Sequence, residues 1–130
     1  MKERRMRRFG LVNGCMDLFH EGHKAFLCHA AMFCDILRVA VNDDASVRRL
    51  KGEGRPVQKA RERAERVAEF ANIVTVFDGD VRALIKRSNP DIIIRGWDQE
   101  IDFHGIPYVV LPRYLGISTT MLLEEQNGDL

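Results

Sequence analysis

Short apolar runs recur along the chain, and stretches with helical periodicity separate them. Each run is continuous, rich in β-branched residues and followed by polar residues or glycine, which is typical of buried strands. The predicted strands lie at 9–13, 36–41, 73–77, 91–94 and 107–111.

The segments between these runs predict helices because their apolar residues recur three or four positions apart. The third helix alternates Arg and Glu around an apolar side, and Asp80 is placed to cap the helix that follows. The predicted helices lie at 22–33, 45–50, 60–71, 81–87 and 119–126, the last capped by Ser118.

Strands therefore alternate with helices from one end of the chain to the other. This order predicts an α/β fold: a single doubly wound domain, Rossmann-like, with a five-stranded parallel sheet covered on both faces. A length of 130 residues fits one domain, which we place at 9–130 after a basic N-terminal extension at 1–8. Ligands of such sheets bind beyond the carboxyl ends of the strands.

The first candidate site follows the first predicted strand. Asn13 and Gly14 break the strand, and His20, Gly22 and His23 stand at the entrance of the next helix. The free N–H groups and positive dipole end there suit an anion, above all a phosphate. A plain polar helix start is the structural alternative.

A zinc site is a weaker interpretation of the same histidines. Zinc takes three or four protein ligands, and only His29 and His104 remain as further histidines. The cysteines Cys15, Cys28 and Cys34 lack the paired spacing of zinc sites and indicate free thiols in a reducing, cytoplasmic compartment.

Near the C-terminus, residues 113–120 place a glycine turn, and then the hydroxyl side chains of 118–120, at the N-terminus of a predicted helix. This pattern also suits a phosphate, although, taken alone, plain N-capping by Ser118 is the favoured interpretation.

Composition narrows the classes of function. The net charge of +1 implies neither a general nucleic-acid surface nor a membrane surface. No apolar run is long enough for a signal peptide or a transmembrane helix.

Three stretches resemble the cytidylyltransferase-like nucleotidyltransferases. Residues 13–23 resemble the family motif NGxFDxxHxGH, with Met16 where the family usually has Phe. Residues 113–120 resemble its RxxGISTT motif. Residues 41–57 resemble the corresponding stretch of ADP-heptose synthase adenylyltransferase domains, and the resemblance as a whole covers nearly all of 9–126.

The resemblance implies transfer of a nucleoside monophosphate from an NTP to a phosphorylated small molecule, with release of pyrophosphate and a need for Mg²⁺. The acceptor is already an anion, so positioning and cationic stabilisation should carry catalysis. The catalytic residues it implies are His20, His23, Lys51 and Arg113. The nucleotide-binding residues it implies are Asn13, Gly14, Cys15, Met16, Asp17, Gly22, Lys24, Arg63, Gly96, Asp98, Gly116, Ile117, Ser118, Thr119 and Thr120.

Asp44, Arg55 and Trp97 complete the set as predicted substrate-binding residues, with half-buried packing as the alternative for Trp97. No protein ligand to a metal ion is predicted. The family commonly forms pairs, and a homodimer is expected here.

The resemblance leaves the substrates open. The stretch at 41–57 favours ATP and a sugar phosphate, whereas 113–120 is closer to glycerol-3-phosphate cytidylyltransferase, which uses CTP. Residues 96–99 are similar to archaeal FMN adenylyltransferases. A nucleotide-binding regulator without catalysis is the alternative that is not an enzyme.

Overall fold

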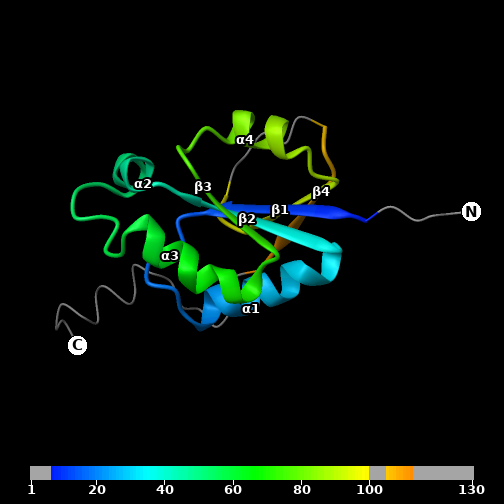
Figure 1. The fold of residues 1–130 in the computed structure, drawn as a ribbon, viewed down its shortest axis with the longest axis horizontal. Coiled ribbons are helices and arrows are strands. Elements are labelled where there is room, and N and C mark those ends of the chain that lie inside the picture. Colours follow the sequence, from blue (N-terminus) through cyan, green and yellow to red (C-terminus); the bar gives the residue numbers. More distant parts are fainter. Residues whose placement is uncertain (1–6, 100–104, 113–130) are drawn as a thin grey trace, which may run out of the picture.

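A computed structural model of the chain describes residues 7–99 and 105–112. Its strands form one parallel sheet in the order β3-β2-β1-β4-β5 (Figure 1). The strands are β1 (Phe9–Gly14), β2 (Ile36–Asn42), β3 (Ile73–Phe77), β4 (Ile92–Gly96) and β5 (Tyr108–Leu111). The five-stranded parallel sheet predicted from the apolar runs is confirmed.

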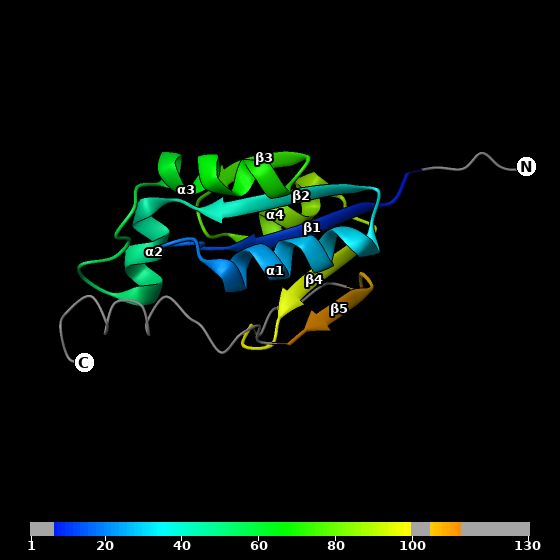
Figure 2. The same ribbon diagram turned by 90° about the horizontal axis from the view of Figure 1, so that it is seen from below.

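Helices cover both faces of this sheet. In Figures 1 and 2, α1 and α3 lie against one face, α4 lies against the other, and α2 lies beyond the carboxyl ends of the strands. The helices are α1 (Glu21–Ala30), α2 (Asp44–Lys51), α3 (Ala60–Val67) and α4 (Val81–Ser88), and the 3-10 turns η1 (Ala31–Phe33) and η2 (Ala68–Phe70) extend α1 and α3. The doubly wound arrangement is confirmed, whereas the predicted helix at 119–126 lies outside the described residues.

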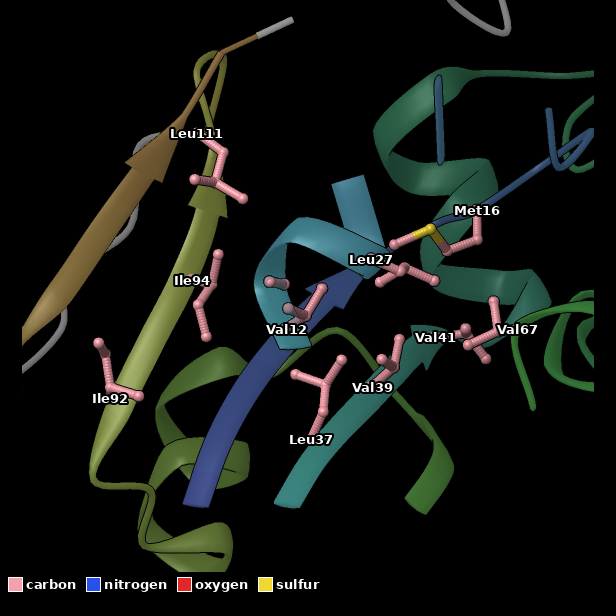
Figure 3. Packing of buried hydrophobic residues seen from close by; sticks show 11 residues of the cluster. Val12, Met16, Leu27, Leu37, Val39, Val41, Val67, Ile92, Ile94 and Leu111 are labelled. Atoms are coloured by element: carbon pink, nitrogen blue, oxygen red, sulfur yellow. The ribbon is translucent and has the colours of Figure 1, made fainter. Parts of the chain in front are cut away.

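The core has two parts because the central strands are buried on both faces. Val12 and Ile94 face α1 and α3, and they pack with Leu27 of α1 and Val67 of α3 (Figure 3). The alternate residue Leu11 belongs to the second cluster, against α4. Side chains of a strand point alternately to its two faces, so burial on both sides explains the continuous apolar runs.

The strand order reverses at β1, which lies between β2 and β4. A crevice forms at such a switch point, outside the carboxyl ends of the strands. The candidate residues at the ends of β1 and β4 therefore lie at this switch point.

The N-cap of α4 also agrees with the sequence: the Asp80 carboxylate accepts the Ala83 N–H at the start of this helix, as predicted.

Candidate active site

Two histidines cap the N-terminus of α1. His20 is the N-cap residue, and its Nδ1 accepts the Gly22 N–H at 3.0 Å. His23 Nδ1 accepts the N–H of His20 at 3.2 Å. This reciprocal arrangement is a capping box, in which imidazole nitrogens replace the usual hydroxyl and carboxylate.

The capping box fixes the tautomer of both rings. A neutral imidazole has one acceptor and one donor nitrogen, so accepting through Nδ1 leaves the proton on Nε2. The rings of His20 and His23 stack with centroids 3.9 Å apart, and Phe19 stacks on His23 at 5.4 Å. His20 Nε2 is buried and has no hydrogen-bond partner among the residues that the structure describes. Each ring can therefore offer an N–H donor for an anionic oxygen.

Both imidazoles are neutral at pH 7. Burial lowers the pKa of His23 to about 3, and the neighbouring charge of His20 acts in the same direction. Burial also lowers the pKa of His20. Lys51, at the end of α2, lowers the pKa of His23 as well, which places its ammonium within electrostatic reach of the pair.

Asp17 anchors the loop that follows α2. Its carboxylate is almost fully buried and accepts the Val57 and Gln58 N–H groups at 2.8 and 3.0 Å and the Arg55 Nε–H at 3.0 Å. Burial opposes ionisation, but these hydrogen bonds and the Arg55 charge together hold the pKa of Asp17 below its ordinary value. The residues on either side of Asp17 adopt left-handed backbone conformations, which brings the carboxylate inward.

Arg63 has the largest fully buried side chain, with none of its surface exposed. Its guanidinium donates to the carbonyl oxygens of Cys15, Asn42 and Gln58 and to the carboxylate of Asp44. The prediction made Arg63 a nucleotide contact. The structure instead places it behind the site, bonded to the segments that form it.

The turn after β4 joins the same edge of the sheet. The Gln99 carboxamide accepts the Gly96 N–H at 2.9 Å and donates to the Asn13 carbonyl at 2.9 Å. This bridge ties the end of β4 to the end of β1 at the switch point. Trp97 lies on the bridged turn with 53% of its surface exposed, next to Asp98.

The structure brings part of the predicted site together. The turn after β1 and the entrance of α1 lie at the carboxyl edge of the sheet. Lys51 is within electrostatic reach of His23 there, and the turn at 96–99 is bonded to the end of β1. Lys24 lies in the first turn of α1, where its ammonium pairs with Glu21 at 3.0 Å on the surface. The predicted residues Arg113, Gly116, Ile117, Ser118, Thr119 and Thr120 lie outside the described residues.

Four predicted binding residues have their charged groups engaged inside the protein. Asp17 and Arg55 pair with each other, and Arg63 pairs with Asp44 at 2.7 Å. The first pair joins two loops and the second joins α3 to α2; the charges of Asp17 and Arg63 are buried, and a buried charge requires a partner. Sequence reasoning also missed Gln58 and Gln99. Gln58 contributes only its backbone N–H and C=O, and the Gln99 carboxamide bonds only main-chain atoms, so neither leaves a motif.

The described residues provide no ready metal cage. Across 7–99 and 105–112, no group of three or more His, Cys, Asp and Glu side chains is arranged to hold a metal ion. Mg²⁺ commonly binds through substrate phosphates with few protein ligands, so a site for a metal-bound nucleotide would not need such a group. No helix of the described part is long and apolar enough to span a membrane.

Comparison with known proteins identifies a family and several relatives of the chain. The family described as cytidylyltransferase-like matches residues 11–125. The chain is 38% identical over 133 residues to the bifunctional protein HldE of Nitrobacter winogradskyi, an alignment that covers 93% of this chain and 27% of that protein. It is 43% identical over 133 residues to HldE of Rhodopseudomonas palustris (strain BisB5), covering 91% of this chain and 26% of the relative. The chain thus spans about a quarter of the length of these relatives.

The fold also has a counterpart among solved structures. A lipopolysaccharide core biosynthesis protein from Thermoplasma volcanium superposes with a TM-score of 0.71 at 22% identity. The match covers 83% of this chain and 97% of that one. It supports the Rossmann-like α/β architecture described above.

Proposed function

Because this chain belongs to the cytidylyltransferase-like family and is a nucleotidyltransferase, we propose that it transfers AMP from ATP to a sugar phosphate and releases pyrophosphate. The choice of nucleotide and acceptor draws on the similarity to HldE proteins. The alignment with them covers nearly the whole length of this chain.

The observation that carries the proposal is the histidine capping box of α1. It supports two neutral Nε2–H donors at a helix N-terminus, beside the switch point of a parallel sheet. Helix N-termini and N–H donors suit phosphate oxygens, and neutral donors avoid the cost of burying a positive charge in the resting site.

The reaction needs little acid–base chemistry. A phosphate oxygen of the acceptor attacks the α-phosphorus of the NTP, and the bond from that phosphorus to the β-phosphate oxygen breaks, so pyrophosphate leaves with the bonding electrons. Negative charge grows on the equatorial and leaving oxygens as this happens. Donors aimed at those oxygens lower the barrier because their interaction strengthens in the transition state.

The chain's own residues divide this work. We assign the Nε2–H groups of His20 and His23 to the phosphate oxygens and the Lys51 ammonium to phosphate charge in both the ground state and the transition state. We assign the N–H groups of Cys15 and Met16, which follow β1, as further donors at the same edge. Trp97 is assigned to the substrate side, because its exposed ring lies on a turn fixed at the switch point.

A divalent cation completes the proposal. Nucleotidyltransferases of this family generally use a divalent metal, and we propose Mg²⁺ carried on the triphosphate. It would neutralise phosphate charge and orient the leaving group. A homodimer and a cytoplasmic location remain predictions; the three thiols, all free, are consistent with a reducing compartment.

The test is pyrophosphate release across ATP, CTP, GTP and UTP with a panel of sugar 1-phosphates, polyol phosphates and FMN. The proposal expects turnover with ATP and a sugar phosphate, and mass spectrometry should find the nucleoside diphosphate sugar. Turnover with CTP and a polyol phosphate alone would overturn the choice of substrates. Absence of turnover with every pair would overturn the proposed reaction.

A further inference from the structure

One buried arginine joins the segments around the proposed site. Arg63 Nη1 donates to the Cys15 carbonyl at 2.8 Å and to the Asn42 carbonyl at 2.6 Å. Its Nε donates to the Gln58 carbonyl at 2.8 Å, and Nη2 donates to Asp44 Oδ1 at 2.7 Å. A single side chain thus fixes the turn after β1, the end of β2, the loop before α3 and the start of α2.

The two carbonyls lie where an anion is expected to bind. Asn42 is the last residue of β2, and Cys15 follows the last residue of β1. Carbonyl oxygens carry partial negative charge and would repel a triphosphate if they faced it. The guanidinium of Arg63 holds both oxygens toward the interior.

The orientation of the Cys15 carbonyl also determines the direction of the Met16 N–H, because both belong to one planar peptide group. The Cys15–Met16 peptide is trans, because the single cis bond among the described residues lies elsewhere. In a trans peptide the N–H points opposite to the C=O. The Met16 N–H is therefore turned away from Arg63, and Met16 itself holds a left-handed backbone conformation with φ of 54°.

Asp44 balances the buried charge and adds a second link. The same Oδ1 that accepts from Arg63 also accepts the Ala60 N–H at 2.8 Å. Ala60 is the first residue of α3, whose N-cap residue Lys59 makes no side-chain cap. One carboxylate in the first turn of α2 thus caps α3 from outside and connects the starts of the two helices.

We propose that Arg63 and Asp44 are positioning residues for nucleotidyl transfer, acting by holding the Cys15 and Asn42 carbonyls inward rather than by touching the nucleotide. This inference rests on the proposed function. The contacts support it because Arg63 is wholly buried and its Nε, Nη1 and Nη2 all donate within the protein.

The test compares three variants with the wild type. Arg63→Lys keeps the charge but cannot reach four acceptors in a planar fork. Asp44→Asn is the milder second variant: it removes the charge of a side chain that is 39% exposed and keeps an oxygen that can accept the Ala60 N–H, so it perturbs folding less than Arg63→Lys does. Arg61→Gln is the matched control, because Arg61 lies on the same helix with 90% of its side chain exposed.

The readouts are kcat, KM for ATP and amide hydrogen exchange of the folded proteins. A displaced reactive geometry costs on the order of 10²-fold in rate, so Arg63→Lys and Asp44→Asn should lower kcat to about that extent while KM for ATP stays close to wild type. Exchange should quicken at 14–18 and 42–46, with the centre of β2 still protected. The double variant should be no slower than the slower single variant, since both act through one link.

Other results would overturn the inference. Normal kcat in folded Asp44→Asn and Arg63→Lys would show that the pair stabilises the fold and does not position catalytic groups. A rise in KM for ATP that accounts for the whole loss of kcat/KM would point to direct nucleotide contact. An inactive wild type would instead refute the proposed function, so the two failures are distinguishable.

Discussion

The histidine capping box makes stability depend on pH in a defined window. The pKa of His23 falls from an ordinary value of 6.5 to about 3 on folding, chiefly through burial. Below pH 6.5 the unfolded chain binds a proton at this ring that the native chain does not. The free energy of unfolding therefore decreases as pH falls from about 6.5 toward 3, and is unaffected by this group above that range.

The size of the change in the free energy of unfolding follows from the one proton that His23 binds in the unfolded chain only. A difference of one bound proton changes stability by about 1.4 kcal/mol per pH unit, so His23 should remove about 2 kcal/mol between pH 7 and pH 5. The pKa values of Asp17 and Asp43 are lowered, so their effects appear only when pH falls below the ordinary carboxyl range. The window from pH 7 to pH 5 thus reports mainly on the histidines. His20 adds to the loss in the same direction.

His23→Gln tests this reasoning. Glutamine is a usual residue at this position of a capping box, so its side-chain oxygen can accept the His20 N–H without titrating. Urea unfolding at pH 7, 6 and 5 should show the wild type losing about 2 kcal/mol more than His23→Gln. Equal losses in His23→Gln and the wild type would refute the assignment of a buried, neutral His23.

Three further predictions concern the reaction and the assembly. His20→Ala should lower kcat by about 10²–10³ with little change in KM for ATP, whereas Lys51→Ala should raise KM as well; normal turnover in folded His20→Ala would contradict the donor role. Excess chelator should abolish pyrophosphate release, and added Mg²⁺ should restore it; full turnover in chelator would exclude the proposed metal. Sedimentation at micromolar concentration should give a homodimer, and a monomer would count against it.

The sequence predicts the sheet and the entrance of α1 well. Continuous β-branched runs bounded by polar turns leave little choice once both faces are covered, and the histidine spacing places both rings on the first turn of a helix. The predicted helix at 60–71 is shorter, since α3 ends at Val67 and continues as a 3-10 turn.

The sequence motifs do not show whether a polar side chain points toward a ligand or into the protein. Arg63 is a positive residue that the resemblance to polyanion-binding enzymes implied at the nucleotide, so a phosphate contact was the natural prediction. Yet it stands four positions before Val67, on the buried stripe of α3, where periodicity alone could have indicated burial. Gln99 had no such signal, because its side chain bonds only main-chain atoms, those of the nearby Gly96 and of Asn13 far along the chain.

The measurement that tests the central claim most directly is nitrogen NMR of the His20 and His23 rings, with and without a non-hydrolysable ATP analogue and Mg²⁺. At pH 7 the account predicts that both rings are neutral and carry their proton on Nε2, and that the analogue shifts the Nε2 resonances while Nδ1 stays an acceptor. Rings that are charged at pH 7, or protonated on Nδ1, would contradict it, as would Nε2 resonances unmoved by saturating analogue.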